Sequence, residues 1–226
     1  MYLRKPMAYK DKYGVEYSDD GKTLVAVRYP KDFVRTYEIP HGVTIIRDSA
    51  FCGCEDLELL VIPDTVEIIE DNAFDACYSL NELVLPQSII SIGKGAFVNC
   101  ESLTTIEIPY GITSIKRHTF WNCEMLSNIT IPNSVTCIDN GAFEGCIALN
   151  GLNLPDSVTS IACRAFSSCR GLESINLPAR ITSIGNEAFA NCNNLREIYV
   201  PQGQKERFAQ MNGLRDFRNL IVETQN

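Results

Sequence analysis

Apolar and polar residues alternate over short stretches that recur along most of the chain. In the stretch from Leu80 to Leu85 (LNELVL), every second side chain is apolar, which predicts a short β-strand with one buried side. Pro86 ends this strand, because proline has no N–H group to donate to a sheet. The next apolar stretch, Ile89 to Ile92, predicts a second short extended piece. Each unit is therefore expected to contain two short strands.

The second half of the unit has a different spacing. Ala96, Phe97 and Cys100 stand at positions i, i+1 and i+4, which is the spacing of one helical turn. Leu103 then returns to the core and starts the next strand. We therefore expect each unit to consist of a strand, a second short strand and one helical turn.

The unit recurs seven times at one fixed interval, which is the step from Pro63 to Pro86. A fixed period of this size is typical of a solenoid, in which each coil buries its apolar side against its neighbours. The repeated positions are held by proline (Pro40, Pro63, Pro86, Pro109, Pro132, Pro155, Pro178, Pro201), phenylalanine (Phe51, Phe74, Phe97, Phe120, Phe143, Phe166, Phe189), cysteine (Cys54, Cys77, Cys100, Cys123, Cys146, Cys169, Cys192) and leucine (Leu57, Leu80, Leu103, Leu126, Leu149, Leu172, Leu195).

The fold class that follows is an α/β-type solenoid, a right-handed coil whose strands form a parallel sheet. We predict one elongated domain with an N-terminal cap at residues 1–33, repeats at 34–201 and a C-terminal cap at 202–226. Val15 to Val27 predicts a hairpin that turns at Asp20-Gly21. Gln204 to Met211 predicts a helix, and Leu220 to Val222 a final strand. Because solenoids need covered ends, two caps indicate a complete unit.

The unit LxxLxIPxxVxxIxxxAFxxCxx resembles the BspA-like subclass of leucine-rich repeats, from Val34 to Pro201. The resemblance implies a curved solenoid used for adhesion or protein binding, commonly on the surfaces of host-associated microbes. It implies no catalytic residues. The position where typical leucine-rich repeats bury an asparagine holds other residues here, so no asparagine ladder is expected. These residues are Gly42, Thr65, Ser88, Gly111, Ser134, Ser157 and Arg180.

The seven repeated cysteines are expected to be buried, reduced thiols that pack as small apolar groups. Their repetition excludes a unique catalytic role. The other three, Cys52, Cys137 and Cys163, occupy three different positions of the repeat. With His41 and His118 as the only histidines, neither a zinc site nor a Cys/His or Ser/His/Asp catalytic set is indicated. The sequence therefore predicts a protein that is not an enzyme and needs no cofactor.

The net charge of −8 is concentrated in one segment. Between Arg47 and Glu82 there are one basic and ten acidic residues, a net charge of −9. An acidic solenoid without a basic stripe is not expected to bind nucleic acid. Four acidic residues of this segment form a weak candidate site for Ca²⁺ or a basic partner, against the alternative of a solvated edge. They are Asp48, Glu67, Glu70 and Asp71.

The outward residues of the predicted strands define a face that is the main candidate for binding, because solenoids commonly bind through extended surfaces. Leu59, Val61 and Val84 form an apolar patch on it. The alternative is that β-branched residues simply favour strands. The remaining candidates on the face are Glu82, Thr105, Glu107, Asn128, Thr130, Asn153, Asn176 and Tyr199.

Two further features carry open alternatives. Trp121, the only tryptophan, is a candidate contact residue for a partner, and packing across neighbouring coils is the alternative. A column of threonines could bind ice, but threonine is also an ordinary solvent-facing strand residue. The column consists of Thr113, Thr136, Thr159 and Thr182.

The chain contains no apolar run of the roughly 18 residues that a membrane-spanning helix needs, so no membrane insertion is expected. Its start, MYLRKPMAYKDKYG, has no apolar core of a signal peptide. The chain is therefore cytoplasmic as written, or secreted or at the cell surface if a signal was removed. We expect a non-enzymatic protein-interaction or adhesion module that binds a protein of unknown identity through its concave sheet face. A structural or surface-display element without a specific ligand is the alternative. The oligomeric state stays open, with a monomer favoured.

Overall fold

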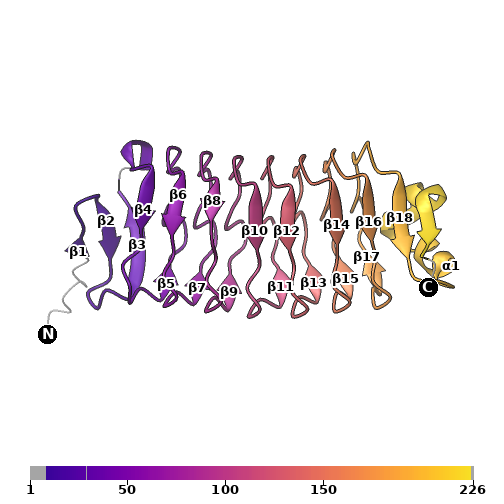
Figure 1. Ribbon diagram of the computed structural model, residues 1–226, viewed down its shortest axis with the longest axis horizontal. Coiled ribbons are helices and arrows are strands. Elements are labelled where there is room, and N and C mark those ends of the chain that lie inside the picture. Colours follow the sequence, from indigo (N-terminus) through magenta and orange to yellow (C-terminus); the bar gives the residue numbers. More distant parts are fainter. Residues whose placement is uncertain (1–8, 29, 225–226) are drawn as a thin grey trace, which may run out of the picture.

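The computed structural model describes residues 9–28 and 30–224, which form a single row of stacked coils (Figure 1). It is a β-solenoid of about nine turns built mostly from parallel sheets. Residues 1–8, where the predicted N-terminal cap begins, lie outside the described residues, as do residues 29, 225 and 226. The predicted repeat and its two strands per coil are confirmed.

The first strand of each coil lies on one side of the solenoid, which we call the strand face. Neighbouring strands pair in parallel exactly one repeat apart, so Leu59 lies opposite Glu82 and Ser174 opposite Glu197. The pairing forms three groups. They are β4 (Thr36–Glu38), β6 (Leu59–Val61) and β8 (Glu82–Leu83); β10 (Thr105–Glu107) and β12 (Asn128–Thr130); and β14 (Gly151–Asn153), β16 (Ser174–Asn176), β18 (Glu197–Val200) and β19 (Ile221–Glu223).

The second, two-residue strands form a further side. Each turns an isoleucine inward and its other residue outward, as in Ser91 and Ile92. These strands also pair in parallel, and their pairing breaks between the third and fourth coils. They are β5 (Ile45–Ile46), β7 (Ile68–Ile69) and β9 (Ser91–Ile92), followed by β11 (Ser114–Ile115), β13 (Cys137–Ile138), β15 (Ser160–Ile161) and β17 (Ser183–Ile184).

The expected helical turn in each repeat is wrong. The segment is a run of reverse turns, in which the amide of Cys77 donates to the carbonyl oxygen of Phe74 (3.2 Å). The alternate amides donate to the next coil instead, as Phe74 does to Ala96 (2.8 Å). Two residues per coil have positive φ, for example Asn72 at 53° and Asn99 in the next coil at 56°. An α-helix has no such residues, so the segment cannot be helical.

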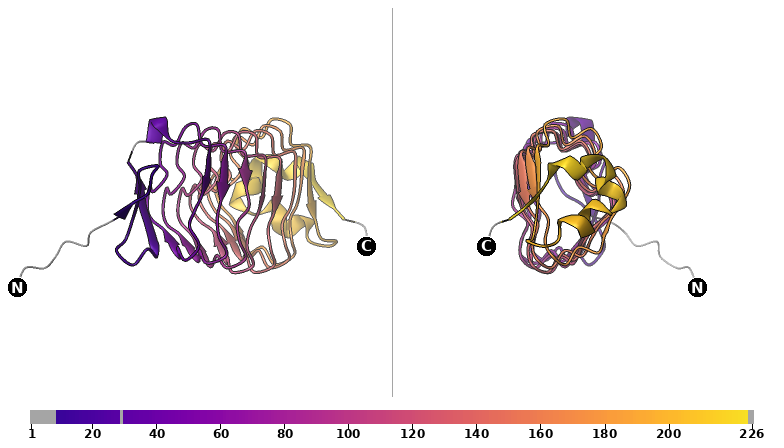
Figure 2. Two further views of the ribbon diagram at one scale, coloured as in Figure 1. Left: turned by 60° about the vertical axis from the view of Figure 1, so that its left-hand side comes forward. Right: turned by 90° about the vertical axis from the view of Figure 1, so that its right-hand side faces the viewer.

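The loss of the helix also removes the reason for strong curvature. A leucine-rich repeat bends when one side carries strands about 4.8 Å apart and the other carries helices about 10 Å wide. Here both sides are joined by backbone hydrogen bonds between coils, so both have the strand spacing. Viewed end-on, the coils superimpose as one narrow ring (Figure 2). The strand face is therefore nearly flat and not the concave surface expected from the sequence.

The core is a single column of repeated side chains. All seven repeat phenylalanines have no exposed surface, and Phe97 stacks between Phe74 (ring centroids 5.3 Å apart) and Phe120 (5.4 Å). The seven repeat cysteines are buried beside this stack. From Cys77 onward each thiol donates to the carbonyl oxygen of a phenylalanine 26 residues earlier, and Cys100 does so to Phe74 at 3.3 Å. Each coil is thereby tied to the one before it.

A second tie replaces the absent asparagine ladder. The hydroxyl of Ser88 donates to the carbonyl oxygen of Val66 (2.6 Å), and that of Thr65 to Val43 (2.8 Å). Equivalent bonds are made in later coils by Ser134 and Ser157. These hydroxyls therefore join neighbouring coils by hydrogen bonds to the backbone, as the asparagines of other leucine-rich repeats do.

Both ends of the stack are covered. At the start, β2 (Val15–Tyr17) pairs with β1 (Tyr9–Lys10) and β3 (Thr23–Val27) in antiparallel fashion, and β3 pairs in parallel with β5. The short 3₁₀ helix η1 (Pro30–Asp32) precedes β4. At the other end, α1 (Lys205–Ala209) buries Phe208, and η2 (Asn212–Leu220) leads into β19. The 3₁₀ helix η2 was not expected. None of the helices among the described residues is long and apolar enough to cross a bilayer.

Candidate functional site

The predicted binding residues, apart from Trp121, lie on the strand face, two in each of four coils and one in each of the next three. Most of them are exposed, and Leu59 and Tyr199 are half-buried. Their shared orientation follows from the alternation within each strand, since the residue between each pair is turned into the core, as Leu60 is. The face therefore follows the row of strands from β6 to β18 along the solenoid (Figure 1).

The apolar part of the strand face centres on Val84. This side chain is 81% exposed and Val61, in the preceding coil, is 43% exposed. Val84 follows directly after β8, at the point where the pairing of the strand face is interrupted before β10. A depression of about 550 Å³ lies there, lined by Val84, Gln87, Glu107 and Thr130 among others. An exposed valine beside a depression is a feature typical of contact surfaces.

The later coils make the strand face polar. The amide nitrogen of Asn176 donates to the side-chain oxygen of Asn153 in the coil before. The hydroxyl of Tyr199 donates to Glu197, and this hydrogen bond raises the pKa of Tyr199. Asn128 is exposed beside the depression. The face thus changes from apolar and acidic near the N-terminal end to mostly small and polar residues in the later coils, and it ends at Glu197 and Tyr199.

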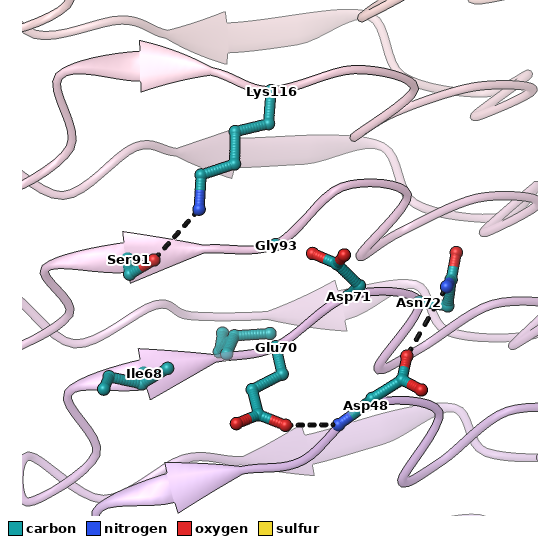
Figure 3. A pocket seen from close by; sticks show the side chains of 9 residues that line it. Asp48, Ile68, Glu70, Asp71, Asn72, Ser91, Gly93 and Lys116 are labelled. Carbon is teal, nitrogen blue, oxygen red and sulfur yellow. Dashed lines mark hydrogen bonds between the residues drawn. The ribbon is translucent and has the colours of Figure 1, made fainter.

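Figure 3 shows a second depression, of about 500 Å³, above the two-residue strands. Gly93 opens it, because this glycine stands in a column between Glu70 and Lys116 and has no side chain. A Cβ atom at Gly93 would come within 2.3 Å of the carbonyl carbon of Glu70, so any other residue would require the backbone to shift. The amino group of Lys116 donates to Ser91 (3.1 Å) across the break between β9 and β11.

The acidic residues around this depression are already engaged. Glu70 accepts from the amide of Asp48 (2.9 Å), and Asp71 accepts from the amide of Lys94 (2.7 Å). Among the residues that the structure describes, no group of three or more His, Cys, Asp or Glu could hold a metal ion. Asp48, Glu70 and Asp71 line the depression but Glu67 does not. The carboxylates of Glu70 and Asp71 thus accept from separate backbone amides, and the weak candidate for Ca²⁺ gains no support from the arrangement.

Trp121 does not belong to the strand face. It is half-buried in the reverse turns of the fourth coil, 6.0 Å from the ring of His118. The two rings lie at one edge of a depression of about 490 Å³, together with Glu144 and Arg164. The sequence left two alternatives for Trp121, packing across neighbouring coils and contact with a partner. Both stay open, because the side chain is half-buried and also lines a depression.

Three of the four hydroxyls in the threonine column are engaged. Thr136 donates to the carbonyl oxygen of Thr113 (3.2 Å), and Thr159 and Thr182 donate to the coil before each of them (3.1 Å in both cases). These bonds strengthen the contact between coils. They also occupy the donors that an ice-binding array would present.

Burial sets the chemistry of the cysteines. It raises the pKa of Cys54 and of Cys192 to about 12, and that of Cys100 well above the ordinary value. A thiol held protonated in this way is a poor nucleophile and a poor metal ligand. Cys52 and Cys163 are exposed. All ten cysteines lie in the described part of the chain, and none is bonded to another.

Several exposed apolar residues were missed from the sequence, and Ile90 and Tyr110 are the most exposed of them. Ile90 is 60% exposed and Tyr110 is 71% exposed. Ile90 occupies the column that later holds the threonines, and Tyr110 occupies the column of His41 and Asp64. Each is an apolar residue at a repeat position that holds polar residues in other coils. That difference could have identified both residues from the sequence.

The comparisons with known proteins agree with the coil described above. A family model described as BspA type leucine-rich repeat region matches residues 29–150 and 113–217, with six copies. The two matches together span well over half of the chain, so the chain belongs to the BspA-type leucine-rich repeat family. Proteins of this family are generally structural or interaction modules, and no catalytic family is indicated. No curated protein matches the chain.

Solved structures of bacterial leucine-rich repeat proteins share the fold. The leucine-rich repeat protein of T. pallidum has a TM-score of 0.74 and 27% identity, covering 93% of this chain and 95% of its own. A leucine-rich repeat protein from Eubacterium ventriosum also has a TM-score of 0.74, with 24% identity, covering 81% of this chain. The match covers 49% of the E. ventriosum protein, so this chain spans about half of its length. At that identity the likeness shows the fold alone.

Proposed function

We propose that this member of the BspA-type leucine-rich repeat family is a protein-interaction module that binds a partner through the strand face around Val84. Leucine-rich repeat proteins usually mediate protein interactions, which makes this class of function the starting point. The observation that carries the proposal is the 81% exposure of Val84 beside a depression at the interruption of the sheet. A valine this exposed costs solvation free energy unless a partner covers it.

The charges around Val84 specify the chemistry of the partner. Glu82 and Glu107 flank it on the same face, and both are exposed. The segment from Arg47 to Glu82 adds a net charge of −9 on the coils before it. The partner proposed is therefore a protein segment that places an apolar side chain on Val84 and lysine or arginine beside the two glutamates. Opposite charges of this kind act mainly on the association rate and on specificity.

The test uses a displayed library of random peptides, selected on the purified chain. We expect enriched peptides to combine an apolar residue with neighbouring lysine or arginine. Val84→Ser should weaken their binding about tenfold, the effect of losing most of one buried valine. Ile90→Ser is the matched control, because Ile90 is a similarly exposed apolar residue of the same coil that lies outside the strand face.

A second variant tests the charge. Glu107→Lys should weaken the same peptides, most strongly at low salt, since salt screens exposed charges. Selection that enriches no peptide would favour a structural or display element without a specific ligand. Peptides that lose affinity equally in the Val84 and Ile90 variants would also overturn the proposal, because they would bind outside the strand face.

A further inference from the structure

The fourth coil departs from the repeat in its reverse turns, which are a different part of the coil from the strand face. The first positive-φ position of the turns holds His118 (φ 56°), whereas the equivalent positions in the coils on either side are glycine, Gly95 and Gly141. Two residues after Thr119 stands Trp121, the only tryptophan of the chain. Thr119 itself is buried and its hydroxyl donates to the carbonyl oxygen of Lys116 (2.8 Å), which fixes the turn locally.

The flanking glycine allows the imidazole to lie over the next coil. A Cβ atom at Gly141 would come within 2.5 Å of Cδ2 of His118 and 3.1 Å of a carboxylate oxygen of Glu144. The His118 ring and the Glu144 carboxylate therefore approach each other above this glycine. The indole of Trp121 lies next to the imidazole, with ring centroids 6.0 Å apart and planes inclined by 34°.

These side chains line one depression of about 490 Å³ that spans three coils. Arg117 lines it from the fourth coil, Asn140 from the fifth and Arg164 from the sixth. Arg164 is held in place by Glu187, whose carboxylate lies 2.6 Å from its guanidinium. The depression thus combines an aromatic platform with a carboxylate, an amide and an oriented guanidinium on a backbone fixed by hydrogen bonds between coils.

The mixture of groups selects one class of ligand. A cation is disfavoured by the two arginines, and a simple anion by Glu144. Burial and the neighbouring Arg117 lower the pKa of His118, which favours the neutral imidazole. A neutral sugar ring offers an apolar C–H side for the indole and hydroxyl groups that both donate and accept. Pockets of this size with an aromatic wall and a few polar groups are typical of small-ligand sites.

We propose that this depression, which we call the Trp121 pocket, binds a neutral hexose unit of a glycan. The sugar ring stacks on Trp121. Its hydroxyls donate to Glu144 and accept from Asn140 and Arg164. The site is separate from the strand face, so a protein partner and a glycan occupy different sides of the same solenoid.

The single tryptophan gives a direct readout. The methyl glycosides of glucose, galactose, mannose and N-acetylglucosamine are titrated into the full chain while Trp121 fluorescence is recorded. We expect a saturable change with at least one of them. Glu144→Gln should weaken that binding about tenfold or more, because it removes a charged acceptor. Glu124→Gln, at an exposed glutamate outside the pocket, should leave it unchanged.

The outcomes separate this inference from the proposed function. Val84→Ser should leave the sugar titration unchanged, and Glu144→Gln should leave the selected peptides bound. No saturable fluorescence change with any of the four glycosides would overturn the proposal. A change that is equal in Glu144→Gln and Glu124→Gln would overturn it as well, because the sugar would then contact Trp121 without the pocket.

Discussion

Replacing Phe97 by alanine removes the central ring of the phenylalanine stack. Phe97 is fully buried and is stacked on both sides, with interplanar angles of 4° to Phe74 and 6° to Phe120. Deleting a buried phenylalanine costs about 3 to 5 kcal/mol through lost burial and the cavity left behind. Each stacked pair contributes about 0.5 to 1.5 kcal/mol beyond buried area, which places Phe97→Ala toward the upper end of that range.

Thermal unfolding followed by circular dichroism measures this cost. For a chain of this length the loss corresponds to a fall in Tm of about 6 to 20 °C. Ile90→Ala, at a 60% exposed position of the same coil, is the matched control and should change stability by less than about 0.5 kcal/mol. Hydrogen exchange should locate the damage at the amides of positions 74 and 97, which donate to the next coil. Equal melting of the two variants would refute the continuous core.

Three further predictions address other parts of the coil. Gly93→Ala should destabilise the protein by about 1 to 3 kcal/mol in urea unfolding, because the new Cβ would meet the backbone of the preceding coil. Gly151→Ala is the control and should be tolerated, because there is open space around Gly151. In the reduced native protein, Ellman's reagent should react first with the exposed Cys52 and Cys163. The seven buried repeat thiols should react only after unfolding, and reaction of all ten in the native protein would contradict the buried column. The bond that Arg28 donates to Glu16 holds the pKa of Glu16 below its ordinary value. The stabilisation from this ion pair is therefore present above about pH 4.3 and is lost as the pH falls. Glu16→Gln should lower Tm at pH 7, and a Tm difference from the parent protein that does not shrink below pH 4 would speak against this ion pair.

The sequence was sufficient for the coil but not for its turns. Phe97 and Cys100 have a counterpart in every unit, and that recurrence alone identifies the buried column. Their spacing, together with Ala96, fits a helical turn and a pair of reverse turns equally well. The feature that distinguishes the two is the glycine or asparagine at positive φ, such as Gly95 and Asn99, since these residues tolerate the left-handed region.

Other contacts depend on the distance between coils, which periodicity does not give. Ser88 was recognised as a replacement for an asparagine, but its bond to Val66 follows only once the coils are stacked. The strand-face candidates were placed together because strand alternation fixes the side of each residue. The Trp121 pocket could not be assembled, because it joins residues of three coils through the space left by Gly141.

The most direct test of the proposed function is photo-crosslinking from the strand face. Benzoylphenylalanine is placed at position 84 in one variant and at position 90 in another, and each is irradiated with the selected peptide. Both positions are exposed, so neither substitution should disturb the core. The proposal predicts a crosslinked product from position 84 and little from position 90. Equal products from both, or a product from position 90 alone, would contradict binding through the strand face.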